Sequence, residues 1–320
     1  MKYSKRKEIA KVAYLYYVEG ENQEQIAKKL GIYRTTVSRM LTQARQEGIV
    51  QINIEGFDEE IFKLETLFKE KYHLKSIEIV PTMEETSEDE KEEKLAQVAG
   101  QWLRNNIHDY DVVGLAWGSS IGRAVAHIEP KFLNETLFVP VVGGSSRTNS
   151  KYHINTLVYD LARKFHGESI FVNGAVVQET KQLAEGIFHS RYFQELRDTW
   201  KRLDMVILGV GGVLSYKKTQ WRDLLDEKDY EDLKLREAIG DCCCRFFDQE
   251  GKILKGSLDQ RTIGLQLEEL SNINQSVAIA RGKAKARAIR ALLKKGYINT
   301  LITDQETVMD ILKLDKVQLD

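Results

Sequence analysis

The 320-residue sequence lacks the features that indicate secretion, a membrane anchor or a disulfide framework. No stretch approaches the ~20 apolar residues that a helix needs to cross a bilayer, and the basic N-terminus has no signal-peptide cleavage site. The three cysteines, Cys242, Cys243 and Cys244, are adjacent, which suits neither a disulfide nor a metal site. We therefore expect a cytoplasmic protein without metal or cofactor, whose cysteines are strand residues facing alternate sides.

The sequence also contains little proline and carries little net charge. Three prolines occur, and Pro81 and Pro140 stand near the ends of predicted strands. The formal net charge is −1, but the first fifty residues carry ten basic and five acidic side chains, which leaves −6 for the remainder. A basic head on an acidic body indicates that the head contacts a polyanion such as DNA.

The basic head has the pattern of three helices, the last two forming a helix-turn-helix. Asn22 is predicted to cap the second helix with Gln25 as capping-box partner, and Gly31 suits the positive φ of the turn. The segment IAKKLGIYRTTVSRML resembles the helix-turn-helix of bacterial transcription regulators. The apolar positions at helical spacing are Ile9, Val12, Ala13, Tyr16, Ile26, Ala27, Leu30, Val37, Met40, Leu41 and Ala44.

In such a motif the N-terminal end of the last helix enters the major groove of DNA. Arg39 suits a bidentate contact with guanine, and Thr36 suits a thymine methyl group or a phosphate. Lys28, with Lys29 and Arg45, is expected to hold phosphates. The predicted DNA-binding set is Lys28, Tyr33, Arg34, Thr35, Thr36, Ser38 and Arg39.

Two segments connect the head to the rest of the chain. The alternation in GIVQINIEG predicts a short strand, a wing, that completes the head. Residues 57–72 predict an amphipathic helix, for which packing on the body and packing on a second subunit are both open. We therefore divide the chain into a DNA-binding domain at 1–55, a linker helix at 56–75 and an effector and oligomerisation domain at 76–320.

The body alternates short apolar runs with segments of helical periodicity. This alternation is typical of βαβ units and predicts an open, mostly parallel, Rossmann-like α/β domain with helices on both faces of the sheet. The predicted strands are 76–80, 112–117, 137–142, 169–172, 205–210, 277–280 and 300–303.

Glycine, hydroxyl and basic residues follow several of these strands. Gly118-Ser119-Ser120 precede a helix, an arrangement in which bare backbone N–H groups bind an anion. Because ligands of parallel sheets bind at the carboxyl ends of the strands, we expect a pocket for a small phosphorylated polyol there. The other residues at these ends are Gly143, Gly144, Arg147, Gly211, Gly212, Arg281, Gly282, Lys283 and Lys285.

The motifs WGSS, VVGG, ILGVGG, GDCCCRFFDQEG, IGLQLEEL and AIARGKAKARAI, behind the helix-turn-helix, resemble the SorC-type, or sorbitol-operon regulator, family over essentially the whole chain. The resemblance implies a sugar-binding domain akin to sugar-phosphate isomerases, in a homodimer or tetramer whose effector alters assembly or DNA affinity. Arg281-Gly282 stands where the family commonly has a glycine pair, and three cysteines follow GD where small or aliphatic residues are usual, so the resemblance does not fix the shape of the pocket or the identity of the effector. The implied effector-binding residues are Gly118, Ser119, Ser120, Gly143, Gly144 and Arg147 around the anion, with Asp241 and Lys285 toward the sugar.

Three functions follow from these patterns. The favoured one is a carbohydrate-operon transcription regulator that binds operator DNA and a sugar or sugar phosphate. An alternative is a sugar-phosphate isomerase or kinase with a fused DNA-binding head, for which Asp241 or Glu185 would be the base. No carboxylate or histidine is paired in sequence with the glycine loops, which disfavours the enzyme. A third is a constitutive DNA binder whose body only oligomerises.

Overall fold

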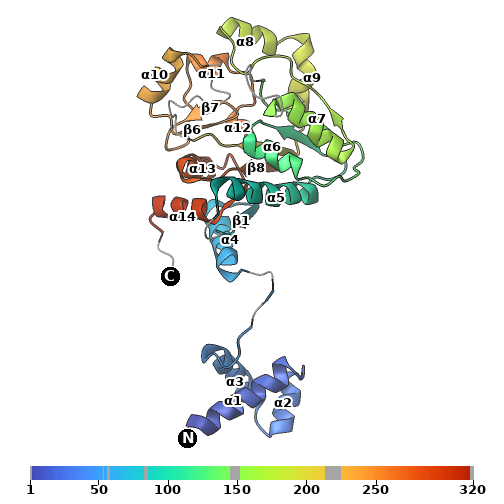
Figure 1. The fold of residues 1–320 in the computed structure, drawn as a ribbon, viewed down its shortest axis with the longest axis vertical. Coiled ribbons are helices and arrows are strands. Elements are labelled where there is room, and N and C mark those ends of the chain that lie inside the picture. Colours follow the sequence, from blue (N-terminus) through green and yellow to red (C-terminus); the bar gives the residue numbers. More distant parts are fainter. Residues whose placement is uncertain are drawn as a thin grey trace. The chain divides into compact units, whose positions relative to one another are not determined.

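A computed structural model describes residues 2–52, 54–55, 58–82, 86–144, 152–212 and 225–317. The chain divides into two units, a head at Met1–Asp58 and a body at Glu59–Asp320. In Figure 1 the head is the blue group of three helices and the body contains the sheets. Across the described part of the chain, no helix is both long enough and apolar enough to span a bilayer.

The head is built from α1 (Lys2–Tyr17), α2 (Gln23–Leu30) and α3 (Arg34–Gln46). Asn22 caps α2, and its capping box with Gln25 is confirmed. Gly31 has φ 69°, so the predicted left-handed turn between α2 and α3 is confirmed as well. The core of the helix-turn-helix is formed by Val12, Leu15, Ile26, Ala27, Val37 and Leu41. Leu15 takes the buried place predicted for Tyr16, which is 37% exposed.

The predicted wing is not seen in the described residues of 49–54, none of which is in a strand. Ile49 packs against the core between α1 and the end of α3. Ile52 and Ile54 are 59% and 58% exposed. Alternation alone does not form a strand, because a strand needs a hydrogen-bonded neighbour and none of the described head residues provides one. Asn53 lies outside the described residues.

The body is organised around a seven-stranded sheet with the order β1-β9-β8-β5-β2-β3-β4, in which every pair is parallel. All seven predicted apolar runs contribute a strand, which confirms the α/β fold class. The strands are β1 (Ser76–Val80), β2 (Val112–Leu115), β3 (Leu137–Pro140), β4 (Glu168–Ser169), β5 (Met205–Gly209), β8 (Gln275–Ile279) and β9 (Thr300–Asp304).

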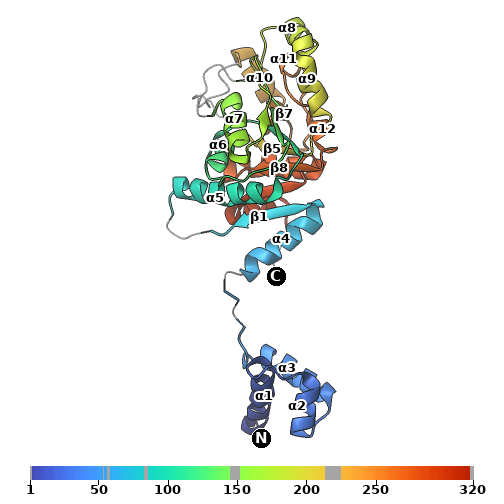
Figure 2. The ribbon, with the colours of Figure 1, turned by 90° about the vertical axis from the view of Figure 1, so that its right-hand side faces the viewer.

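Helices cover both faces of this sheet. Right-handed crossovers place α5, α6 and α7 on one face and α9 and α13 on the other, and Figure 2 shows α6 and α7 across the sheet from α9. Their bounds are α5 (Glu88–Asn106), α6 (Ser119–Ala126), α7 (Ile154–Phe165), α8 (Lys181–Phe188), α9 (Arg191–Trp200), α13 (Lys283–Lys295) and α14 (Gln305–Leu314). The linker helix α4 (Glu59–Tyr72) packs on the body, where Ile61, Leu64, Phe68 and Tyr72 join the main core.

A second, two-stranded sheet lies between β5 and β8 in the sequence. This part of the chain contains α10 (Glu227–Leu235), β6 (Gly240–Cys242), β7 (Arg245–Phe247), α11 (Ser257–Arg261) and α12 (Leu267–Leu270). The antiparallel register pairs Cys242 with Arg245, so Cys243 and Cys244 form a two-residue turn. Their φ angles are 50° and 58°, the left-handed values that such a turn requires. The prediction that all three buried cysteines are strand residues is therefore wrong for Cys243 and Cys244.

A buried carboxylate fixes the end of α4 to the body. Asp315, just after α14, accepts hydrogen bonds from Tyr72 of α4 and Arg290 of α13, and it lies 3.1 Å from the Lys71 ammonium. Burial acts to raise the pKa of Asp315, but the hydrogen bonds from Tyr72, Arg290 and Lys71 outweigh burial and hold that pKa below its ordinary value. The helix that follows the head is thereby tied to both α13 and α14.

We predict that Asp315→Asn lowers the free energy of unfolding by about 2–4 kcal/mol at pH 7, because Arg290 and Lys71 lose their counter-charge. Tyr72→Phe removes one neutral donor and should cost only about 1 kcal/mol. Urea unfolding of the two variants and the wild type measures both values.

The loss in free energy of unfolding caused by Asp315→Asn should depend on pH in one direction. A carboxyl group whose pKa is depressed in the folded state stabilises the fold while it is ionised, and this contribution is lost as pH falls through the folded-state pKa. The deficit should therefore be full at neutral pH and shrink in acid. A deficit of equal size throughout would show that Asp315 acts through packing and not through charge.

Candidate functional site

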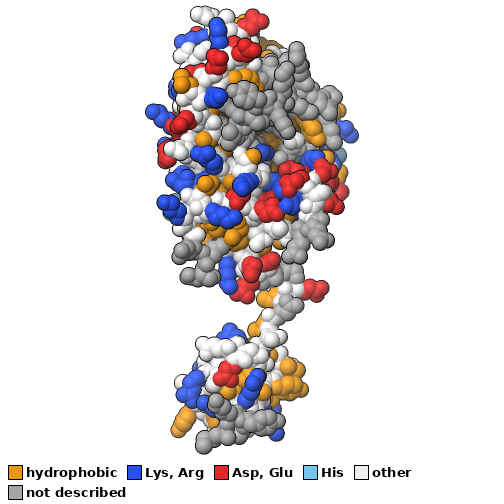
Figure 3. Space-filling view, turned by 60° about the vertical axis from the view of Figure 1, so that its left-hand side comes forward, with side chains coloured by type: hydrophobic (Ala, Val, Ile, Leu, Met, Phe, Trp, Pro, Cys, Tyr) orange, Lys and Arg blue, Asp and Glu red, His pale blue; other side chains and the backbone are white. Residues whose placement is uncertain are grey.

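The predicted DNA contacts of the head lie on an accessible surface. Tyr33, which precedes α3, is 84% exposed, and Arg34, Thr35, Ser38, Arg39 and Lys28 are exposed while Thr36 is half-buried. Their side chains form no hydrogen bond or ion pair with any described residue. Lys29, by contrast, pairs with Glu21. Figure 3 shows Lys and Arg side chains on the visible face of the head. The first turn of α3 therefore presents unengaged donors, as a DNA-reading helix requires.

Helix N-termini differ in whether a side chain caps them. Among helices of eight or more residues with a described N-cap, α2, α5, α7, α8, α9, α10 and α14 are capped by a side chain, whereas α3, α6 and α13 are not. The N-cap residues of α6 and α13 are Gly118 (φ 153°) and Gly282 (φ 102°), values that L side chains rarely adopt. Uncapped N–H groups and the helix dipole favour an anion, so α6 and α13 are candidate anion sites in the body.

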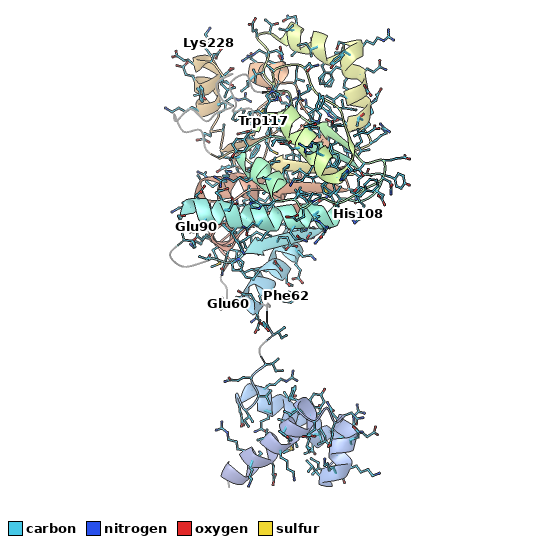
Figure 4. All side chains as sticks on the ribbon, turned by 45° about the vertical axis from the view of Figure 1, so that its right-hand side comes forward. Glu60, Phe62, Glu90, His108, Trp117 and Lys228 are labelled. Atoms are coloured by element: carbon cyan, nitrogen blue, oxygen red, sulfur yellow. The ribbon has the colours of Figure 1, made fainter. Side chains whose placement is uncertain are left out.

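The start of α6 lies where the strand order reverses. From β2 the chain builds outward through β3 and β4, whereas β5, β8 and β9 build toward the other edge. Ligands bind at such a switch point, outside the carboxyl ends of the strands. Trp117, labelled in Figure 4, joins two strand ends here, because its Nε1 donates to the Gly143 carbonyl oxygen over 3.1 Å. Sequence reasoning missed Trp117, which had the signal of standing directly before Gly118.

The second side of the switch point is formed by Gly211, Gly212, Asp241 and Lys285. The Gly211 N–H donates to the Asp241 carbonyl oxygen (2.8 Å), and the Asp241 N–H donates back to Gly211 (3.3 Å). A Cβ on Gly211 would lie 2.0 Å from Asp241 Oδ1, and a Cβ on Gly212 would lie 2.5 Å from the Ala284 carbonyl oxygen. Only glycines allow the β6–β7 hairpin and α13 to approach the end of β5 so closely. The structure therefore brings together Gly211, Asp241 and Lys285.

Lys285, in the first turn of α13, carries a charge that burial penalises. Burial lowers the pKa of Lys285, the nearby Arg281 lowers it further, and attraction to Glu92 and Asp241 opposes both. The Lys285 ammonium has no hydrogen bond or ion pair within the described ranges. An anionic ligand would supply the missing partner, which makes Lys285 a candidate receptor for a phosphate or carboxylate.

Arg281 has a different role from the one its place after β8 indicates. It is 4% exposed, and its guanidinium donates to Asp304 (2.6 Å), Glu88 (3.1 Å) and Glu92 (3.2 Å). Arg281 is thus neutralised by α5 and β9. Sequence reasoning missed Glu92, because it belongs to an acidic run that reads as solvated surface.

The remaining predicted effector residues fall into two groups. Ser119 is exposed and Ser120 is buried at the open start of α6. The N–H groups of Gly143 and Gly144 donate to the carbonyl oxygens of Ile263 (3.0 Å) and Gly174 (2.8 Å). These two glycines therefore hold backbone segments together and offer no free amide. Arg147 lies outside the described residues.

Comparison with known proteins matches both units. The family model "Putative sugar-binding domain" matches residues 58–313, and a homeodomain-like helix-turn-helix model matches residues 3–52. The sorbitol operon regulator of Klebsiella pneumoniae is 31% identical over 95% of this chain and 97% of its own length. The crystal structure of that full-length regulator matches 96% of this chain and 98% of its own, with a TM-score of 0.76 and 30% identity.

A further crystal structure, of a transcriptional regulator from Streptococcus pneumoniae TIGR4, is 43% identical with a TM-score of 0.78, over 82% of this chain and 100% of that one. The matches span the head, the linker helix and the body in one continuous order. The chain therefore belongs to the SorC-type family, the sorbitol-operon regulators, as its sequence motifs indicated.

Proposed function

We propose that this chain is a DNA-binding transcriptional regulator of a carbohydrate-metabolism operon, acting in the cytoplasm and controlled by a sugar or polyol phosphate. One observation supports the sensing half of the proposal: the start of α6 has no side-chain cap, and the Lys285 ammonium beside Gly212 has no hydrogen bond or ion pair among the described residues. Family membership supports the regulatory role, and the names of the relatives point to carbohydrate operons.

In this proposal the ligand phosphate binds the backbone N–H groups and hydroxyls of Ser119 and Ser120. The Asp241 carboxylate accepts hydrogen bonds from ligand hydroxyls, and Lys285 donates to the phosphate or to an acidic group at the other end of the ligand. The site binds its ligand without turning it over. Incubation with a panel of aldose and ketose phosphates tests this point, since turnover would favour the enzyme alternative.

Control of DNA binding follows from differential affinity. A dimer places two copies of α3 about 34 Å apart, on successive turns of a palindromic operator. A ligand changes operator occupancy only if it binds one conformation or assembly of the protein better than another. The same free energy must act in both directions, so operator DNA should alter the ligand affinity by the factor by which ligand alters the operator affinity.

We predict that Lys285→Met lowers the affinity for the best sugar phosphate about 10- to 100-fold, as expected for loss of a charge-assisted hydrogen bond. Calorimetric titration after a thermal-shift screen of phosphorylated sugars measures the change. Lys294→Met, at an exposed position in the last turn of the same helix, is the matched control and should bind like the wild type.

The stability of the ligand-free Lys285→Met variant separates binding from folding. Because burial disfavours the charged form of Lys285, the variant should unfold at the same temperature as the wild type or slightly above it. Weakened binding in a protein of unchanged stability supports a ligand contact. Unchanged affinity in Lys285→Met would remove Lys285 from the site.

We predict different effects from two substitutions in the head. Arg39→Ala should cost about 1–3 kcal/mol on a selected operator and little on scrambled duplex, because it removes a base contact. Lys28→Ala should weaken both duplexes alike and reduce the slope of log affinity against log salt by about one. Lys63→Ala, on α4 of the body, is the control.

Fluorescence anisotropy across a salt series, with an operator isolated from genomic fragments, measures these changes. Equal losses on both duplexes in Arg39→Ala would reassign Arg39 to the phosphate backbone. Absence of sequence-selective binding by the wild type, with and without sugar phosphates, would contradict the proposed function itself.

A further inference from the structure

The two edge strands of the seven-stranded sheet, β1 and β4, differ in whether other parts of the chain cover them. An edge strand presents unpaired backbone N–H and C=O groups, which proteins commonly cover. At one edge, α4 packs on β1 in the body core, and the Ile79 N–H donates to the Glu65 carboxylate over 3.2 Å. That edge is therefore closed by the protein's own linker helix.

The opposite edge, at β4, is not closed in this way. The Glu168 and Ile170 N–H groups donate inward to carbonyl oxygens of Thr136 and Phe138, so the backbone groups of Ser169 and Phe171 face outward. No described residue hydrogen-bonds to the outward groups of Ser169 or Phe171. The next residue, Val172, is by contrast satisfied by the Asn155 amide, which both donates to it (2.9 Å) and accepts from it (3.0 Å).

Aromatic side chains line an open groove of about 1070 Å³ along this edge, between α7 and α9. Tyr159, Phe171 and Tyr192 are 50%, 42% and 67% exposed. The Asn173 amide donates to the Tyr192 hydroxyl over 2.7 Å, which holds that ring at the groove. Figure 2 shows α7 and α9 on opposite faces of the sheet, so the groove follows the sheet edge itself. Single exposed aromatics are ordinary, but three around one unpaired strand mark an interaction surface.

The charged side chains of the groove would be complementary to those of a second copy related by a two-fold rotation. Arg191 and Glu195, one turn apart on α9, both line the groove and are exposed. Neither forms an ion pair within the described part of the chain. An antiparallel copy of α9 would bring Arg191 of one chain opposite Glu195 of the other, twice in each dimer. A surface that is complementary to itself in this way suits a two-fold homodimer.

We propose that the β4 edge, defined by Tyr159, Ser169, Phe171, Arg191, Tyr192 and Glu195, binds the same edge of a second copy of this chain. Two β4 segments pair antiparallel across the two-fold axis and continue the sheet from one copy into the next. The choice of a second copy over an unrelated peptide rests on the self-complementary charges and, in part, on the proposed function, since two heads are needed to read a palindrome.

Sedimentation equilibrium of the full chain tests the proposal. The wild type should dimerise, and Tyr192→Asp should raise the dimer dissociation constant at least about tenfold, because it places a charge in the centre of the contact. Leu235→Asp, at an 83% exposed position at the end of α10, is the matched control and should leave the constant unchanged. A wild type that stays monomeric, or a Tyr192→Asp variant that associates like the wild type, would overturn the proposal.

Charge reversal adds a test that a folding defect cannot imitate. Arg191→Glu alone and Glu195→Arg alone each place like charges across the axis and should weaken the dimer. The double variant restores unlike charges and should recover most of the wild-type constant. Failure of the double variant to recover, with an unchanged thermal midpoint, would overturn the proposed pairing. A dimer that obeys these rules but binds no operator would contradict the proposed function and leave the surface intact.

Discussion

The handedness of the crossover connections is the constraint on which the proposed effector site depends. Because β2 lies between β3 and β5, the chain builds toward one sheet edge and then toward the other. Right-handed crossovers then place the connections on opposite faces, and the carboxyl ends of β2 and β5 form the switch point at which ligands of such sheets bind. The uncapped start of α6 and the glycine pair after β5 both lie at this switch point. Residues far apart in the sequence meet there because of topology, and no local motif specifies the meeting.

Steric contacts then limit which elements can approach this switch point. The β6–β7 hairpin reaches the end of β5 only because Gly211 leaves room for the Asp241 carboxylate, and α13 begins beside Gly212 for the same reason. The turn of this hairpin has only two residues, Cys243 and Cys244, and both have left-handed φ angles. Non-glycine residues in that conformation store strain, which surrounding packing must offset. Cys243 and Cys244 are both buried in the main core, where such packing is available.

Local features could be predicted from the sequence, and features set by distant packing could not. The helix-turn-helix and all seven strands follow from periodicity, capping residues and turn glycines, each of which acts over a few positions. The prediction of a wing was wrong because a strand needs a hydrogen-bonded neighbouring strand, and the alternation of apolar and polar residues does not show whether one is present. Glu92 was missed because only the packing of α5 turns it toward Arg281 and Lys285. The N–H groups of Gly143 and Gly144 donate to backbone carbonyl oxygens of distant residues, which no rule of sequence spacing identifies.

The distribution of charge around α13 links sensing to the rest of the body. Arg281 is neutralised by three carboxylates, so among the described residues of the candidate site the positive charge left for a ligand comes from Lys285 and the open helix starts. Farther along α13, Arg290 binds Asp315, which also holds Tyr72 of α4. The helix α13 therefore carries both Lys285, the proposed ligand contact, and a contact to α4, the segment that leads to the head. A ligand could alter the position of α4 through these contacts only if it bound two arrangements of α13 with different affinity, and the shift could not exceed that difference in free energy.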